Sequence, residues 1–486
     1  MSELAPAAGE RRSPLFLWSI TAALAGFLFG FDTIVISGAE QSIEKVWGLS
    51  STQHGLAIGS ALWGTVLGSI LGGWPADTFG RRKTLIAIGG LYFLSAVWSA
   101  LAGSVIPFAT ARFLGGVGVG VATVAAPLFI SEIAPADRRG RLTGLFQFNI
   151  VFGILVALAS NAVIGTLLLP VVPEGEQAPV DTVAWRWMLG VEALPAAVYC
   201  LMAFLLPESP RWLMTRRGDR AAAADVLRRI DRSADVEAEL DRYAADQTPQ
   251  ARRRPPLSVL KRPLLLAFLI AMFNQLSGIN AIFYFAPRIF EAAGFAAQAG
   301  LLESVGLGVT NLIFTFVGLY LIDRLGRKTL LLIGSVGYIA SLGACAWAFQ
   351  SGNTSFVPAC LFAFIAAHAV GQGAVIWVFI SEIFPTSARA LGQSFGSATH
   401  WVFAALLTTV FPIIAGSEEE DLPALASQAQ IFSFFCGMMV LQLIWVLTMV
   451  PETRGVPLEE VSRKLGVRLE DAAGGGLSDT ASAGTP

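Results

Sequence analysis

Twelve apolar runs, each long enough to cross a lipid bilayer, constrain this chain more than any other feature of its sequence. A helix needs about 20 apolar residues to span the hydrocarbon core of a membrane. Runs of about this length cover residues 14–38, 54–76, 84–104, 108–131, 142–168, 185–206, 264–291, 302–322, 329–349, 356–380, 390–415 and 428–450. Because a chain in lipid must satisfy its backbone hydrogen bonds internally, such runs form helices. The sequence therefore predicts an all-α membrane protein with twelve transmembrane helices.

The composition supports this prediction and excludes several classes of function. Charged residues make up 14% of the chain and hydrophobic residues 54%, whereas soluble domains carry about 25% charged residues. The net charge is -2, and no basic tract is interleaved with aromatic residues, so nothing indicates nucleic acid as a partner. The sequence shows no metal-ligand spacing of cysteine or histidine, no nucleophile constellation and no phosphate loop. We therefore expect neither an enzyme nor a bound metal or cofactor.

The distribution of basic residues predicts how the spans are oriented. If both termini are cytoplasmic, all but four of the 33 lysines and arginines lie on the cytoplasmic side. The exceptions are Lys45, Arg112, Arg186 and Arg288. Lysine and arginine concentrate in cytoplasmic loops of membrane proteins. We therefore expect a multi-pass protein of the cell (inner) membrane with both termini in the cytoplasm.

A polar segment separates two blocks of six spans. This segment is rich in arginine and has amphipathic helical patterns at 221–230 and 236–243, which predict a small cytoplasmic helical linker domain. The predicted domains are a disordered N-terminus (1–13), an N-terminal bundle (14–206), the linker (207–262), a C-terminal bundle (263–450) and a cytoplasmic tail (451–486).

The two blocks repeat each other in sequence. DTFGRRK at 77–83 recurs as DRLGRK at 323–328, and FISEIAP at 129–135 recurs as FISEIFP at 379–385. A third motif, PESPR, begins at Pro207 and recurs as PETR from Pro451. Parallel repeats of six spans are typical of transporters in which two bundles rock about a site at the middle of the membrane.

A carboxylate in the first span is the most unusual single residue. Asp32 lies mid-membrane, where a charged side chain costs about 3 kcal/mol. Arg112 in the fourth span is the only basic residue inside the first bundle and is its candidate partner. A carboxylate that gains and loses contact with a cation between two conformations takes up and releases protons. The alternative is a permanent ion pair that only fixes helix packing.

A second set of charges is assigned to the cytoplasmic ends of the spans. Topology alone explains the basic residues, but it does not explain acids that recur at matched points of both halves. We predict a latch of ion pairs that holds the cytoplasmic face shut in one state and breaks in the other. Its members are Asp77, Arg81, Arg82, Glu132, Arg139, Glu192, Glu208, Asp323, Arg327, Glu382, Arg389 and Glu452.

With these motifs the chain resembles the sugar porter branch of the major facilitator superfamily, from about residue 15 to 460. The DxxGR loop marks the superfamily, and PESPR in the first half with PET after the second is specific to sugar porters. The resemblance implies two pseudo-symmetric six-helix bundles and a monomer that takes up a small-molecule sugar from across the lipid bilayer. Proton symporters of the family resemble this chain at Asp32, so we expect import of a monosaccharide, a hexose or a pentose, with protons. An energy-independent sugar or polyol facilitator and a non-transporting sugar receptor are the alternatives.

Polar and aromatic residues inside the spans suggest a sugar site. Amides bind hydroxyl groups as donors and acceptors, and an aromatic ring stacks on the apolar face of a sugar. Any one such amide could instead join two helices. The candidates for substrate binding are Gln147, Asn274, Gln275, Asn280, Asn311, Gln372, His400 and Trp401. The resemblance adds Phe29, Tyr284 and Phe285 as aromatic residues that line or gate the site.

Three of these positions depart from the family pattern. Asn274 stands where many sugar porters have glutamine, Gln372 where several have a stacking tryptophan, and His400 where others have glutamine. Gly278 follows the amides of the seventh span and could break the helix, which would let Gln275 join the cavity. His400 could also titrate and couple a second proton.

Overall fold

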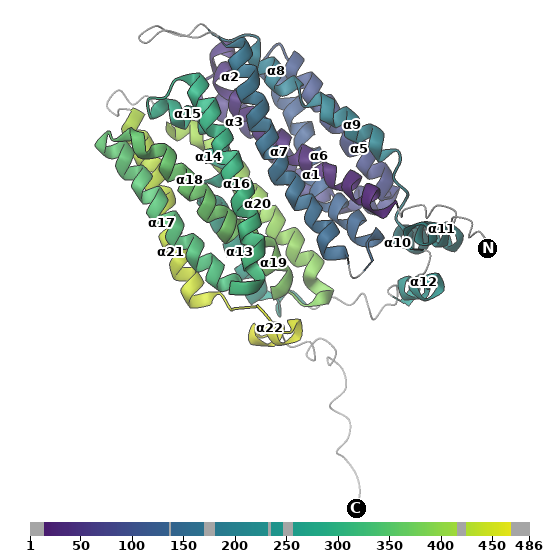
Figure 1. Cartoon of the computed structure of the whole chain (residues 1–486). Helices are drawn as coiled ribbons and strands as arrows, with labels where there is room; N and C mark the ends of the chain where they lie inside the picture. Colours follow the sequence, from purple (N-terminus) through teal and green to yellow (C-terminus); the bar gives the residue numbers. More distant parts are fainter. Residues whose placement is uncertain are drawn as a thin grey trace, which may run out of the picture.

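The computed structural model describes residues 14–135, 138–169, 180–231, 235–245, 256–415 and 424–467, and all regular structure within these ranges is helical (Figure 1). The first half contains α1 (Leu15–Val35), η1 (Ile36–Gly38), α2 (Glu40–Trp47), α3 (Ser51–Leu71), α4 (Gly73–Phe79), α5 (Arg81–Leu101), α6 (Val105–Ile133), α7 (Arg139–Leu168), α8 (Ala184–Gly190) and α9 (Ala193–Ala203). The second half contains α13 (Lys261–Leu276), α14 (Ile279–Tyr284), α15 (Ala286–Ala292), α16 (Ala297–Leu325), α17 (Arg327–Ser351), η3 (Thr354–Phe356), α18 (Val357–His368), η4 (Ala369–Gly373), α19 (Ala374–Ile383), η5 (Thr386–Ala388), α20 (Arg389–Ala415) and α21 (Ala424–Met449).

The number of spans agrees with the sequence. Within the described ranges, 11 helical segments are long and apolar enough to cross a membrane. The remaining predicted run, 185–206, is divided into α8 and α9 at Val191 and Glu192, and these two helices together supply the sixth span. The predicted all-α, twelve-span fold is therefore confirmed.

The two halves lie side by side, the first in purple to blue and the second in green to yellow (Figure 1). Their main contacts run between α3 and α20 and between α7 and α16. Gly55 on α3 permits the first contact, because a Cβ at this position would lie 2.0 Å from the carbonyl oxygen of Thr409 on α20. Small residues allow membrane helices to approach this closely.

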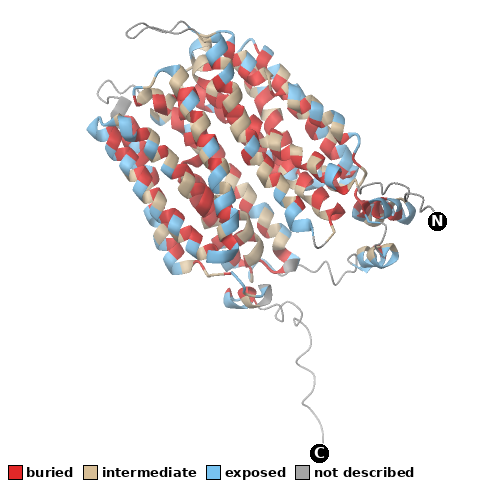
Figure 2. Ribbon diagram, in the orientation of Figure 1, coloured by how far each residue is buried: buried red, intermediate tan, exposed pale blue. Residues whose placement is uncertain are grey.

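The helices carry large apolar side chains on the outer surface of the bundle, where many positions are exposed (Figure 2). Leu101, Leu167 and Leu205 are 75%, 75% and 71% exposed. Apolar surface of this extent is unfavourable in water but is solvated by lipid tails. The interior is also mainly apolar, with a smaller set of buried polar side chains, so the bundle is apolar both inside and on its lipid-facing surface.

The linker consists of α10 (Pro210–Trp212), η2 (Leu213–Arg217), α11 (Arg220–Ile230) and α12 (Val236–Ala245), and α22 (Leu458–Lys464) follows the last span. The Trp212 indole donates a hydrogen bond to the Asp77 carbonyl oxygen at 2.8 Å, which docks the linker on the first half. We call the end of the bundle that carries these helices the linker end, and the opposite end, which carries α2 and α15, the α2 end (Figure 1). The segments 1–13 and 468–486, expected to be disordered or part of the tail, lie outside the described residues.

The seventh span is broken as the sequence suggests. The helix α13 ends at Leu276, and Gly278 has a φ of 87°, a left-handed conformation that favours glycine. A Cβ at Gly278 would also lie 2.5 Å from the Phe435 ring. The chain resumes as α14, so the span Lys261–Tyr284 consists of two helices, and α15 follows it.

Candidate substrate and proton sites

Asp32 and Arg112 form a buried ion pair between α1 and α6. The Arg112 guanidinium donates from Nη1 to Asp32 Oδ1 at 2.5 Å and from Nη2 to the Asp32 carbonyl oxygen at 2.8 Å. The two side chains are 1% and 2% exposed. The partnership predicted from the sequence is therefore present.

Glu192 joins this pair, which corrects its prediction as a member of the cytoplasmic latch. It is buried at the break between α8 and α9 and lies close enough to Asp32 and Arg112 to interact with both electrostatically. Glu192 stands near the middle of the span that α8 and α9 form, so it lies inside the half and away from the linker end. An acid within an apolar run was the signal that could have revealed it.

The charges of this cluster do not balance. Asp32 and Glu192 supply two carboxylates against the one guanidinium of Arg112, and Asp32 Oδ2 and Glu192 Oε1 are buried without a hydrogen-bond partner. Leaving one charge unpaired in a buried site costs several kcal/mol. The cluster therefore holds one carboxyl group more than its single guanidinium can pair with.

A group of amide and aromatic side chains lies on the facing helices α13, α19 and α20. Gln275 Nε2 donates to Asn274 Oδ1 at 3.0 Å and lies 3.1 Å from His400 Nε2. The His400 ring packs against Trp401 and Trp377, with ring centres 4.8 and 5.2 Å apart. The structure thus brings three predicted residues, Asn274, Gln275 and His400, into direct contact. Trp377 was not predicted, although it is an indole in a cavity-forming span.

Trp401 also meets the opposite half. Its ring lies edge-on to Phe29 of α1, with ring centres 5.4 Å apart. The half-buried Gln147 on α7 and the buried Asn311 on α16 sit on the second pair of helices that pack across the halves. The predicted residues on these four helices therefore all belong to elements at the boundary between the halves.

Several buried polar atoms in this region have no hydrogen-bond partner. They are Gln275 Oε1, Asn280 Nδ2, Tyr284 Oη and Trp401 Nε1. Buried polar groups in native proteins are nearly always paired, so these atoms are open to hydrogen bonds from water or a ligand. Tyr284 lies close enough to Arg112 and Asp32 to interact with both electrostatically, which connects the amide cluster to the charged cluster.

Gln372 lies apart from this cluster, and its predicted role in substrate binding is not supported. Its Nε2 donates to Gln442 Oε1 at 2.6 Å, and Gln442 Nε2 donates to Ser335 Oγ at 3.0 Å. These residues join η4, α17 and α21 within the second half. The amide stands in a helix-packing network, which the sequence could not distinguish from a cavity position.

The linker end of the first half carries a dense ion-pair network. Arg81 contacts Glu132 through two hydrogen bonds of 2.9 Å and Asp77 at 3.0 Å. The Glu208 carboxylate accepts from the backbone nitrogens of Arg81 and Arg82 at 2.7 and 3.2 Å. Five predicted latch residues are therefore assembled within one half.

The second half repeats this network. Arg327 donates to Glu382 at 3.0 and 2.7 Å and to Asp323 at 3.3 Å. Glu452 accepts from the backbone nitrogens of Arg327 and Lys328 at 3.0 and 3.1 Å. Glu132 and Glu382 each pair with an arginine of their own half in this state.

Two further latch residues, Arg139 and Arg389, stand at the starts of α7 and α20. Arg139 is exposed, and Arg389 is half-buried with its Nε unpartnered.

A bridge that the sequence missed joins the halves at the α2 end. Arg288 on α15 donates to Glu40 on α2 at 3.0 and 2.8 Å and also contacts Glu44. Gln41 donates to Glu291 at 3.0 Å beside it. Burial is the largest influence on the pKa of Glu40 and raises it, but the Arg288 charge and the contacts of Glu40 with His54 together bring that pKa below its ordinary value. The signal in the sequence was Arg288 itself, which is one of the four basic residues that do not lie on the predicted cytoplasmic side.

Phe285, predicted to line or gate the site, lies at this end. Its ring stacks on Phe411 with centres 4.6 Å apart and meets His54 of the first half edge-on. Its place is thus beside the bridge rather than within the amide cluster.

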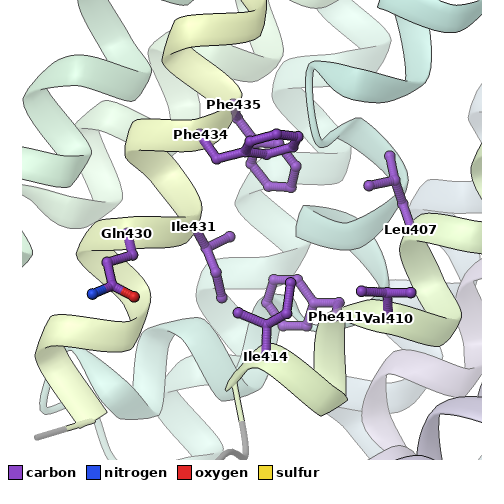
Figure 3. A pocket seen from close by; sticks show the side chains of 8 residues that line it. All are labelled: Leu407, Val410, Phe411, Ile414, Gln430, Ile431, Phe434 and Phe435. Carbon is purple, nitrogen blue, oxygen red and sulfur yellow. The ribbon is translucent and has the colours of Figure 1, made fainter. Parts of the chain in front are cut away.

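An apolar cavity of about 250 Å³ lies between α20 and α21 (Figure 3). Its lining residues are Leu407, Val410, Phe411, Ile414, Gln430, Ile431, Phe434 and Phe435. Phe434 and Ile414 are about half exposed, at 51% and 46%. The cavity contains none of the residues of the amide cluster and faces outward, so it is a lipid-facing groove rather than a sugar site.

The structure has two helical bundles, a buried carboxylate–arginine cluster, and amides with free polar atoms at the boundary between the bundles. This combination defines a secondary transporter. The chain belongs to the family described as "Sugar (and other) transporter", whose model matches residues 18–465.

Known proteins agree with this assignment. The chain is 32% identical over 478 residues to the D-xylose-proton symporter of Escherichia coli, covering 92% of this chain and 95% of the relative. It is 33% identical over 465 residues to the galactose-proton symporter of the same species, covering 94% and 95%. The inward-open structure of the xylose transporter from E. coli superposes with a TM-score of 0.78 at 29% identity, covering 93% and 99%.

Proposed function

We propose that this chain imports a monosaccharide together with protons by alternating access. The observation that carries the proposal is the buried cluster of Asp32, Glu192 and Arg112, which has one carboxylate more than it has guanidinium groups. Its neighbour Tyr284 stands on α14, directly after the amides of α13. The names of the relatives, proton symporters of xylose and galactose, support the same assignment.

We propose that the linker end faces the cytoplasm, as the basic residues predict, and that the chain works as a monomer in the cell membrane. The state described here then has its outer side closed by the bridge from Arg288 to Glu40. Its inner networks are held within each half, so the inner side is the one free to open. Rocking of the bundles would break the outer bridge and let the inner arginines exchange carboxylate partners across the halves.

We propose that the proton binds first from outside, at the carboxyl pair Asp32 and Glu192. A proton on the pair weakens the attraction of Arg112 for Asp32, because the protonated carboxyl no longer carries a charge. The sugar binds between the halves and pairs with the free polar atoms of Gln275, Asn280 and Trp401. Movement of α14 with the bound sugar would shift Tyr284 relative to Arg112, which links sugar binding to proton release.

The proposed substrate is a monosaccharide, a hexose or a pentose. The amides supply two-way hydrogen bonds to hydroxyl groups, and the indoles of Trp401 and Trp377 supply apolar faces around His400. The cluster therefore retains a stacking surface although Gln372 replaces the tryptophan that the family pattern would place there. A facilitator, which needs no proton site, does not account for the unbalanced carboxylates.

Uptake into proteoliposomes tests this function. Vesicles containing the purified chain are offered labelled xylose, glucose, galactose and inositol with and without an inward proton gradient. We expect at least one monosaccharide to accumulate only when the gradient is present. Equal uptake under both conditions would show a facilitator, and no uptake of any substrate would show a receptor; either result contradicts the proposal.

A further inference from the structure

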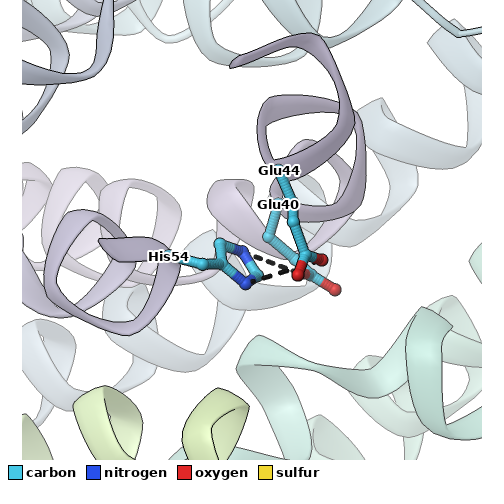
Figure 4. Close-up of side chains that lie close together, drawn as sticks. All are labelled: Glu40, Glu44 and His54. Carbon is cyan, nitrogen blue, oxygen red and sulfur yellow. Dashed lines mark ion pairs between the residues drawn. The ribbon is translucent and has the colours of Figure 1, made fainter. Parts of the chain in front are cut away.

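Three side chains with metal-ligand chemistry meet at the α2 end, outside the sites described above (Figure 4). Glu40 and Glu44 come from α2 and His54 from the first turn of α3. His54 Nε2 lies 3.1 Å from Glu40 Oε2, and His54 Nδ1 lies 3.6 Å from Glu44 Oε2. One ligand atom from each of the three residues can be chosen so that all lie within 4.8 Å of one another.

The local sequence determines this arrangement. Glu40 and Glu44 are four residues apart and therefore share one face of α2. The helix stops at Gly48, whose φ of 56° turns the chain back. Ser50 then caps α3, with Gln53 N donating to Ser50 Oγ at 3.3 Å and Ser50 N donating to Gln53 Oε1 at 3.1 Å. The tight turn brings His54 against the acidic face of α2.

His54 is an unusual residue in this position. Its side chain is fully buried, and the partners of its ring nitrogens are the two carboxylates, Glu40 at 3.1 Å and Glu44 at 3.6 Å. A buried imidazole that faces two carboxylates is arranged as a ligand beside two further ligands.

We propose that Glu40, Glu44 and His54 form a Zn²⁺ site. Zinc binds imidazole nitrogen and carboxylate oxygen, and three protein ligands leave a fourth position for water. Ligand atoms about 2.1 Å from a tetrahedral ion stand about 3.4 Å apart. One imidazole gives one nitrogen to an ion, and the 3.1 Å from His54 Nε2 to Glu40 Oε2 is close to that spacing. Glu44, the least buried of the three at 27% exposed, can adjust to complete the set.

Arg288 competes with the metal for the same oxygens. Its guanidinium donates to Glu40 and contacts Glu44 in the bridged state, while Lys45 and Glu291 are the other charged groups nearby. Arg288 belongs to the second half, so the carboxylates are released only when the halves separate at the α2 end. A ligand that binds one of two states shifts the population toward it. Zinc therefore stabilises the state that is open at the α2 end, and this consequence for transport rests on the proposed function.

Zinc binding to the purified full chain tests the site directly. The protein in detergent is stripped with a chelator and titrated with Zn²⁺ in a calorimeter, and its folding is monitored by thermal melting. We expect one site, weakened at least about tenfold by His54→Ala and by the partly exposed Glu44→Gln. Arg288→Ala should bind more tightly than the wild type, because the competing cation is gone. If His54 had a purely structural role, zinc binding would not weaken in His54→Ala while it tightens in Arg288→Ala.

Two results would overturn the site: wild type and Arg288→Ala both fail to bind zinc, or folded His54→Ala and Glu44→Gln both bind as the wild type does. In proteoliposomes, Zn²⁺ added on the α2 side should inhibit uptake by the wild type and have at least about tenfold less effect on His54→Ala. Binding without inhibition would overturn the conformational consequence alone. A wild type that transports nothing contradicts the proposed function and leaves the calorimetric result standing.

Discussion

Arg288 of the second half and Glu40 of the first form a two-point ion pair, with hydrogen bonds of 3.0 and 2.8 Å, across the boundary between the bundles. Glu40 is completely buried, whereas Arg288 is 20% exposed. The two halves are therefore tied at the α2 end, while the arginines of the linker end pair within their own halves.

Removal of Arg288 should open the α2 end. Loss of one partner of a buried ion pair costs about 3–5 kcal/mol, and the partial exposure of Arg288 places the effect at the lower end. Spin labels at the exposed positions Lys45 and Ala297 report the distance between the halves, and Arg288→Ala should shift it to longer values. Arg186→Ala is the matched control, because Arg186 donates only to carbonyl oxygens of the first half in this structure. An unchanged distribution in Arg288→Ala would contradict the role of the bridge.

The same bridge should withstand mild acid. The pKa of Glu40 lies below the ordinary value of 4.5. A carboxyl group with a lowered pKa in the folded state contributes stability that is present above its unfolded pKa and lost as pH falls through the folded value. The spin-label distance in the wild type should therefore be the same at about pH 7.5 and about pH 5.5. A longer distance at the lower pH would show that Glu40 is already protonated there.

Neutral replacements in the charged cluster should separate transport from accumulation. Asp32→Asn and Glu192→Gln each leave one carboxylate for Arg112, which balances the charge without a proton. We expect both variants to lose gradient-driven accumulation, with sugar reaching only its outside concentration, and to retain exchange of labelled for unlabelled sugar. Full accumulation of sugar by Glu192→Gln would contradict a role of Glu192 in proton coupling and leave it with a structural role.

The networks at the linker end should matter for the transport cycle more than for binding. Glu132→Gln and Glu382→Gln each remove the bidentate partner of a largely buried arginine. Loss of such a partner costs more than the ~1.4 kcal/mol that corresponds to a tenfold change in rate. We therefore expect transport rates to fall at least about tenfold. Sugar affinity measured by calorimetry should remain. Glu237→Gln, in an exposed pair with Arg220, is the control and should transport normally. If both test variants transport sugar at normal rates, the networks affect only the topology of the chain and not the transport cycle.

Two glutamines of the second half should respond oppositely to substitution. Gln275→Ala should raise the KM for sugar, because it removes polar atoms at the amide cluster. Gln372→Ala should leave KM unchanged and lower the melting temperature, since it strands Gln442 at a cost of about 1–3 kcal/mol. A raised KM in Gln372→Ala would restore it to the sugar site.

Much of the fold was predictable from the sequence, because the bilayer imposes strong and local rules. Span length, backbone satisfaction and the bias of basic residues act on each segment separately, so the twelve runs can be read without knowing their neighbours. The break at Gly278 was predictable for the same reason, since it depends on one residue's conformational freedom. Asp32 was conspicuous because one charge in a membrane span is expensive wherever the span lies.

The site was only partly predictable, because its members are brought together by packing between spans. Glu192, Gln372 and Arg288 illustrate three outcomes of that packing. Glu192 lies inside its half beside Asp32 instead of at the linker end, Gln372 faces Gln442 instead of the amide cluster, and Arg288 crosses to the other half to meet Glu40.

The sequence by itself determined that the chain is a two-fold repeat of six membrane spans with a costly acid in the first. Local hydrophobicity and repetition carry that information. Only the tertiary structure decided which carboxylates surround Arg112, which amides face one another and which end is tied shut. The rotation of each helix and the distance between halves set those contacts, and both depend on residues hundreds of positions apart.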